Sequence, residues 1–136
     1  MEPAAGKPVT SILVVDDEPD ILYLLSTFVQ DAFPKARVVT ARTGPEGLGI
    51  LEKGPVSAIV SDYRMPGMDG IEFLSKARTR YPDCGRILMT AFADATLEPR
   101  ALSSGVHSFI EKTADPEDLV LALTAALDKN AAEAAS

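Results

Sequence analysis

Five polar side chains stand at the ends of short apolar runs in this chain, where a strand would give way to a loop. The runs are "SILVV", "VSAIVS", "RILM" and "VHSFIE", and the polar residues are Asp16, Asp17, Asp62, Thr90 and Lys112. Carboxylates held close together repel one another, whereas a Mg²⁺ ion takes such hard oxygen ligands and leaves other positions for water or phosphate oxygens. If the fold brings these residues together, we expect a magnesium site that can receive a phosphoryl group.

Each of these residues also has an ordinary structural explanation when it is taken alone. Acids ahead of Pro19 suit the positive N-terminus of a following helix, and Asp62 could cap a turn. Threonine is common in strands, and a lysine most often lies in solvent. The chemical interpretation therefore depends on the fold placing all five at the same edge. Zinc is not expected there, because no cysteine or histidine is among them.

The chain alternates between strand and helix patterns from Ser11 to about Asp128. Apolar runs predict strands at residues 11–15, 37–41, 56–61, 86–91 and 106–112. Amphipathic stretches predict helices at residues 21–29, 45–53, about 69–81, 95–104 and 115–127. Strands that alternate with helices form a parallel sheet covered on both faces, so we predict a doubly wound α/β domain. Such sheets bind ligands at the carboxyl ends of their strands, where the five polar residues stand.

The segment "RMPGMDG" follows closely on Asp62 and leads into the third predicted helix. Pro66 restricts the backbone, while Gly67 and Gly70 allow turns that other side chains would obstruct. We expect this loop to leave Asp62 exposed and open to approach from outside. In the helix that follows, helical spacing predicts a shared face made of Ile71, Leu74, Ala77, Arg78 and Tyr81.

Local signals also predict where the last two helices begin and end. Either Pro99 lies in the first turn of the fourth helix or that helix begins late, and Gly105 is a natural residue to end it. Asp115 suits the N-cap of the fifth helix, with Pro116 at its first helical position. We expect a flexible N-terminal arm at residues 1–9, one domain at 10–128 and a fraying C-terminal tail at 129–136.

Composition limits the partners that the chain can have. With 136 residues, 46% of them hydrophobic and 24% charged, the chain has the length and make-up of one globular domain. Its formal net charge of −7 disfavours direct binding to nucleic acid. No apolar run approaches the roughly 20 residues that cross a membrane, and the N-terminus lacks the pattern of a secretory signal. We therefore expect a cytoplasmic protein with no membrane partner, in which Cys84 is an ordinary thiol and the lone His107 has no assigned role.

Four motifs together resemble one protein family. The motifs are "ILVVDDEPDI", "SDYRMPGMDGIEFL", "ILMTAFAD" and "GVHSFIEK". In this order and near this spacing, they resemble the receiver domain of bacterial two-component response regulators, over a span from Thr10 to Leu127. The resemblance implies a flavodoxin-like fold, in which five helices cover a parallel sheet of five strands in the order 2-1-3-4-5. It also implies a protein of phosphorelay signal transduction that is not a turnover enzyme on an external substrate.

The same resemblance implies a role for each residue of the acidic edge. Asp62 is the phosphoacceptor, which becomes an aspartyl phosphate, and Lys112 is the cation beside the phosphoryl group. Asp16 and Asp17 hold Mg²⁺ together with Asp62 and the backbone carbonyl of Arg64. The implied phosphodonor is a sensor histidine kinase or a phosphotransfer protein. A carboxylate is a competent nucleophile toward phosphohistidine, which makes this assignment chemically sound.

Thr90 and Phe109 are implied to form the switch of the domain. In the family the hydroxyl at the Thr90 position moves toward the phosphoryl group, and the aromatic ring at the Phe109 position turns into the space it leaves. Phe109 fits equally well as a core aromatic of its strand. The surface built by the fourth helix, fifth strand and fifth helix would then present a new shape to a downstream target or effector domain. Whether phosphorylation also drives homodimerisation through this surface is left open.

Two departures from the family pattern and two alternative functions remain. Thr113 follows Lys112 where the family usually has a proline, and Arg64 occupies a position that adjusts access to the phosphoryl group.

A phosphatase of the haloacid dehalogenase type would need an acid at position 64 and a cap domain, and the chain has neither. A degenerate receiver that acts as a constitutive interaction module would have lost one of the five residues, and all five are present. Either the chain acts alone or it is the receiver part of a longer regulator.

Overall fold

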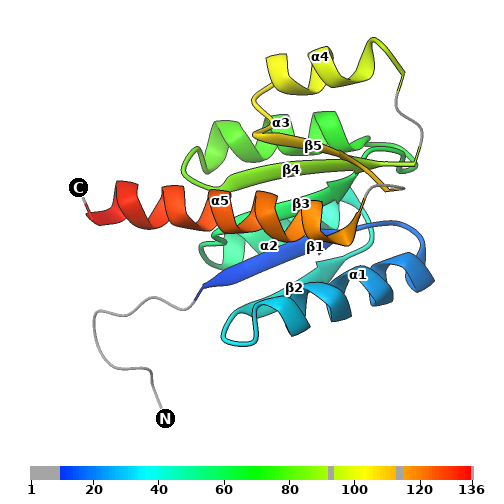
Figure 1. Cartoon of the computed structure of the whole chain (residues 1–136). Helices are drawn as coiled ribbons and strands as arrows, with labels where there is room; N and C mark the ends of the chain where they lie inside the picture. The colour runs from blue at the N-terminus through cyan, green and yellow to red at the C-terminus, as the bar shows by residue number, and fades with distance from the viewer. Residues whose placement is uncertain (1–9, 92–93, 113–114, 136) are drawn as a thin grey trace.

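The predicted doubly wound fold is confirmed by the computed structural model, which describes residues 10–91, 94–112 and 115–135. Five parallel strands form one sheet in the order β2-β1-β3-β4-β5, and helices connect them (Figure 1). The strands are β1 (Ser11–Val15), β2 (Arg37–Ala41), β3 (Ala58–Asp62), β4 (Gly85–Thr90) and β5 (Ser108–Glu111). The helices are α1 (Pro19–Ala32), α2 (Gly44–Lys53), α3 (Gly70–Arg80), α4 (Leu97–Ser103) and α5 (Pro116–Ala135).

The sheet separates two hydrophobic cores, as expected when helices cover both of its faces. On one face Val14 packs in a cluster with Leu22 of α1 and Leu123 of α5. On the other face Leu13 belongs to a cluster that includes Phe73 of α3. Figure 1 shows α1 and α5 together on the near side of the sheet. The alternation of side chains along β1 therefore sends successive residues into different cores.

Several element boundaries differ from the predicted ones, most of them by one to three residues. Asp62 is the last residue of β3 rather than the first residue after it, and β5 is shorter than predicted. The fourth helix begins late enough for Pro99 to lie in its first turn, and Gly105 follows its end with a φ of +97°. The fifth helix continues to Ala135, through residues that we had expected to fray. Residues 1–9 and Thr113, which also carried predictions, lie outside the described residues.

The buried face of α3 differs from the one that helical spacing predicted. Phe73 is fully buried beside Leu74 and Ala77, whereas Arg78 is exposed. The ring of Phe73 reaches α2, where a Cβ atom at Gly47 would lie 2.8 Å from the ring Cζ. The third helix thus packs against α2 as well as against the sheet, which rotates its buried face toward Phe73.

None of the described helices is both long enough and apolar enough to span a membrane.

Candidate functional site

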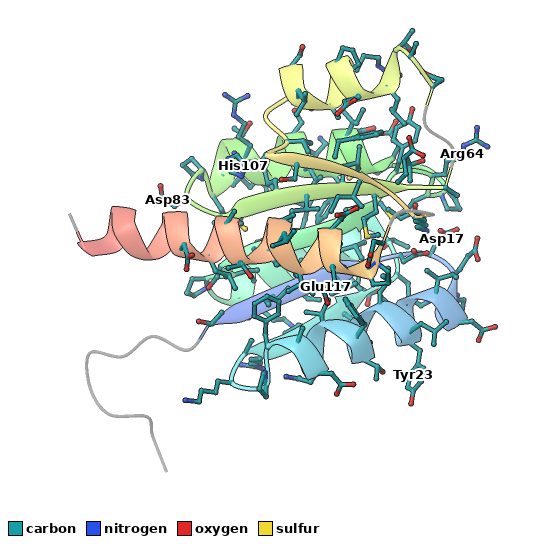
Figure 2. The ribbon with its side chains drawn as sticks, viewed as in Figure 1. Asp17, Tyr23, Arg64, Asp83, His107 and Glu117 are labelled. Carbon is teal, nitrogen blue, oxygen red and sulfur yellow. The ribbon has the colours of Figure 1, made fainter. Side chains whose placement is uncertain are left out.

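Three carboxylates meet at the carboxyl ends of the neighbouring strands β1 and β3. One carboxylate oxygen from each of Asp16, Asp17 and Asp62 lies within 4.8 Å of the other two. Asp16 is fully buried, Asp17 is half-buried, and Asp62 is only 8% exposed. The expectation that the loop leaves Asp62 exposed was therefore wrong: β3 extends through this residue, and α3 begins directly above its backbone carbonyl. Figure 2 shows Asp17 and Arg64 at this same edge of the molecule.

Lys112 bridges two of these carboxylates. Its Nζ atom lies 2.9 Å from Oδ2 of Asp16 and 3.1 Å from Oδ1 of Asp62. Its backbone N–H donates to the carbonyl oxygen of Thr90 at 2.7 Å, which fixes the residue just beyond the end of β5. Three carboxylates and one ammonium group leave two negative charges on the cluster. The predicted meeting of Asp16, Asp17, Asp62 and Lys112 is thus observed.

Burial and neighbouring charge shift the pKa values of two of these groups. Burial raises the pKa of Asp62, and the carboxylates of Asp16 and Asp17 add to that effect, while Lys112 opposes it. Burial by itself lowers the pKa of Lys112, but the hydrogen bond and the charge of Asp16, together with those of Asp62, raise it overall. Lys112 therefore stays charged at neutral pH. Burial and the neighbouring carboxylates, by contrast, destabilise the ionised form of Asp62.

Backbone hydrogen bonds fix the loops that carry the acids. The N–H of Asp16 donates to the carbonyl oxygen of Ala41 at 3.2 Å, and its own Oδ1 accepts from the N–H of Glu18 at 3.0 Å. After β3, the N–H of Tyr63 donates to the carbonyl oxygen of Met89 at 2.9 Å. These contacts tie the two acidic loops to neighbouring strands, so the carboxylates are positioned before any ligand arrives.

Sequence reasoning missed Arg42, which also contacts the acidic edge. One Nη2–H of Arg42 donates to the backbone carbonyl of Asp17 at 3.3 Å. Arg42 directly follows β2, the strand that neighbours β1, so its place at the same carboxyl-terminal edge was the signal that could have found it. Its role is to steady the loop from outside, because it contacts the backbone rather than a carboxylate.

An open hollow of about 450 Å³ adjoins the acids, lined by Asp17, Tyr63, Arg64, Met65, Pro66 and Asp69. Arg64 is exposed on this hollow. The donor set suits a hard divalent cation, because the clustered groups are carboxylates with two uncompensated negative charges. The geometry therefore fits Mg²⁺ and leaves room beside it for waters or phosphate oxygens.

Thr90 and Phe109 lie on the same face of the sheet. Thr90 ends β4 and is 1% exposed. Phe109 stands opposite Leu88 in the β4–β5 pairing, and both pack into the core on the α3 side. Since side chains alternate along a strand, Thr90 points to the same side as Leu88, which makes it a diagonal neighbour of Phe109. Phe109 is half-buried.

The raised pKa of Asp62 predicts an unusual effect of pH on stability. The folded state holds its proton on Asp62 to a higher pH than the unfolded chain does, so this group's contribution to stability falls as pH rises through the raised pKa. In metal-free buffer we expect Asp62→Asn to raise Tm by a few degrees at pH 7. The gain should vanish as pH falls toward the unfolded carboxyl pKa, about 4. Thermal unfolding of both proteins from pH 4 to 7 measures it. A lower Tm for the variant at pH 7 would mean that the Lys112–Asp62 ion pair outweighs burial and repulsion.

Comparisons with known proteins identify the family. The chain matches the response regulator receiver domain over residues 12–124. It is 34% identical over 121 residues to the transcriptional regulatory protein GlrR of Escherichia coli (strain K12), a match that covers 88% of this chain and 27% of GlrR. It is 32% identical over 117 residues to the probable chemotaxis protein CheY of Rhizobium etli, covering 84% of this chain and 89% of that protein.

Solved structures agree with this assignment. A CheY-like response regulator receiver domain protein from Methanospirillum hungatei superposes with a TM-score of 0.84 at 29% identity, covering 93% of this chain and 99% of that one. The chain spans about a quarter of the length of GlrR and of other long relatives. It belongs to the receiver domain family of two-component response regulators, whose role is phosphorelay signalling.

Proposed function

We propose that Asp62 accepts a phosphoryl group from a phosphohistidine of a sensor histidine kinase or phosphotransfer protein, in a reaction that depends on Mg²⁺. The observation that carries this proposal is the meeting of Asp16, Asp17, Asp62 and Lys112 at one edge of the sheet with two uncompensated negative charges. A divalent cation would balance that charge. Arg64 and Asp17 line one hollow, which supports the backbone carbonyl of Arg64 as a further ligand.

The transfer requires little covalent chemistry from the protein. A carboxylate oxygen of Asp62 forms a bond to phosphorus while the phosphorus–nitrogen bond of phosphohistidine breaks, and the electron pair returns to the imidazole, which takes up a proton. Lys112 already lies 3.1 Å from Asp62, so its ammonium group can stabilise an equatorial phosphoryl oxygen. The hydroxyl of Thr90 supplies a directional hydrogen bond. Asp16, Asp17, Asp62 and the Arg64 carbonyl would hold Mg²⁺, which would supply charge neutralisation at the phosphoryl oxygens when bound.

Phosphorylation replaces about one negative charge on Asp62 with roughly two and adds three acceptor oxygens. These oxygens would draw the Thr90 hydroxyl toward them, and the ring of Phe109 would turn inward. The surface of α4, β5 and α5 would then change its shape for a downstream protein, an effector domain or a second copy of the chain. GlrR is by name a transcriptional regulator of which this chain matches only a part, which supports an effector carried on another segment. We place this signalling step in the cytoplasm, with a single phosphorylation of Asp62 as its outcome rather than repeated turnover.

Intact-mass measurement after incubation with acetyl phosphate tests this function. We expect a gain of one phosphoryl group that requires Mg²⁺ and is absent in Asp62→Asn. Asp83→Asn is the matched control, because Asp83 is exposed and lies far from Asp17 and Arg64 (Figure 2), and it should be phosphorylated like the parent. No gain in the parent protein under any condition would favour a constitutive interaction module.

A further inference from the structure

Arg86 is a buried cation near the start of β4, the strand that ends at Thr90. It is 4% exposed, and its Nε–H donates to the carbonyl oxygen of Gly105 at 2.9 Å. Its Nη1 group donates to the carbonyl oxygens of Cys84 at 2.7 Å and Pro82 at 3.3 Å. One side chain thereby holds together β4, the turn before it and the segment between α4 and β5.

Hydrogen bonds to the backbone, rather than an ion pair, compensate for the burial of Arg86. Within the described part of the chain no carboxylate forms an ion pair with it. Arginine stays protonated in folded proteins, and its planar guanidinium group presents five donors in a rigid fork. A buried cation is costly unless its donors are satisfied, so the carbonyl groups around Arg86 must keep their places. The segments that carry them are therefore fixed relative to β4.

The end of α4 is held on a second side by α3. Gly105 follows this end with a φ of +97°, and a Cβ atom there would lie 2.8 Å from Nε of Arg78. The backbone N–H of the next residue, Val106, donates to the carbonyl oxygen of Ala101 at 3.1 Å, and Val106 is buried. The connection from α4 to β5 thus lies between α3 and the sheet, with its carbonyl group bound to Arg86.

The start of α4 is held in a different way. Oδ1 of Asp94 accepts from the N–H of Thr96 at 2.8 Å, from its hydroxyl at 2.7 Å and from the N–H of Leu97 at 2.9 Å. These bonds join the loop to the first turn of the helix, so they can move together with it. A helix of seven residues depends on such outside contacts, because it is too short to be stable alone. The hydrogen bonds of Arg86, by contrast, reach the other end of α4 from the sheet.

We propose that Arg86 anchors the connection between α4 and β5 to the sheet, so that α4 is displaced at its start and pivots at Gly105. The two elements that this connection joins belong to the predicted switch surface. Thr90 lies at the opposite end of β4 from Arg86, on the side from which the chain continues to the start of α4. A rearrangement at Thr90 would therefore displace the start of the helix and leave its end in place. The anchor belongs to the unphosphorylated fold, so it does not require that Asp62 accept a phosphoryl group.

Amide hydrogen exchange of the parent protein, without metal or phosphodonor, tests this difference between the two ends of α4. The N–H of Arg100 closes the first turn by donating to the carbonyl oxygen of Thr96 at 3.3 Å, whereas the N–H of Val106 reports the anchored end. After correction for intrinsic exchange rates, we expect Val106 to exchange about tenfold more slowly than Arg100. Equal protection of the two amides would overturn the proposal, and this result does not depend on how any variant folds.

Arg86→Met tests the source of that protection. Methionine has a similar length but no donor, so the carbonyl groups of Gly105 and Cys84 would lose their partner. We expect exchange at Val106 to become about tenfold faster relative to exchange at Val14, a buried residue of β1 that reports unfolding of the whole domain. Equal acceleration at Val106 and Val14 would show general destabilisation without an anchor.

Arg78→Met is the matched control. It removes the other positive charge near Gly105 but none of the hydrogen bonds of Arg86, and the methionine side chain can still cover the glycine. Exchange at Val106 should therefore stay at the parent rate relative to Val14. If Arg78→Met accelerated it as much as Arg86→Met does, the hydrogen bonds of Arg86 would not be the anchor.

Discussion

Lys112→Met is expected to slow the phosphorylation of Asp62 by about 100-fold, the usual cost of removing one preorganised group that stabilises transition-state charge. The ammonium group lies 3.1 Å from Oδ1 of Asp62 and the Lys112 side chain is only 19% exposed, so water cannot easily replace it. The same substitution should tighten Mg²⁺ binding, because it removes a positive charge from beside the three carboxylates. Rates come from the growth of phosphorylated protein by mass, and Mg²⁺ affinity comes from calorimetric titration.

Slower phosphorylation together with tighter Mg²⁺ binding would distinguish a direct role of Lys112 from general damage to the fold. A misfolded site would lose both Mg²⁺ binding and phosphorylation. Arg80→Met provides the matched control, because Arg80 forms a 2.9 Å ion pair with Glu52 on the surface, with side chains 55% and 62% exposed. Such exposed pairs contribute little, so neither rate nor affinity should change in this control. Phosphorylation of Lys112→Met at the parent rate would remove Lys112 from the proposed machinery.

The sequence predicted the order of the elements and the acidic edge because both follow from local patterns. Short apolar runs bounded by turn residues are typical of buried strands, and strands that alternate with helices favour parallel pairing. Asp16, Asp62 and Lys112 each stand at a strand end, and the carboxyl ends of parallel strands share one edge. Their meeting therefore needed no knowledge of side-chain packing.

Features that depend on contacts between distant elements were not predictable in this way. Asp62 was expected to be exposed but is buried, because α3 begins close above the end of β3. Phe73 was left out of the α3 face because its burial depends on the approach of α2. Arg86 was expected only to begin a strand, and its burial depends on the β4–β5 register and on carbonyl groups from two loops. His107 is exposed, as expected.

Gly70→Ala is expected to destabilise the protein by about 2–3 kcal/mol, a cost typical of forcing an extra methyl group into a packed site. A Cβ atom at Gly70 would overlap the backbone carbonyl oxygen of Asp62 and lie 2.7 Å from Cδ1 of Leu88. A backbone carbonyl within a central strand cannot move aside as a flexible side chain can. That carbonyl also accepts a hydrogen bond from the Ser61 hydroxyl at 2.9 Å, so a shift there would disturb Asp62, the proposed phosphoacceptor.

Gly49→Ala isolates the steric cause, because it makes the same chemical change in the helix α2 with no atom within 4 Å of the new Cβ. Alanine restricts the unfolded chain and favours helix, so this variant should gain roughly 0.5–1 kcal/mol and be phosphorylated like the parent. Urea unfolding gives both stability changes, and mass measurement gives the phosphorylation rates. We expect Gly70→Ala to lose rate as well as stability, since α3 can begin in place only by displacing the end of β3. Equal stability of the two alanine variants would show that the loop accommodates a side chain at position 70, and that the tight start of α3 does not position Asp62.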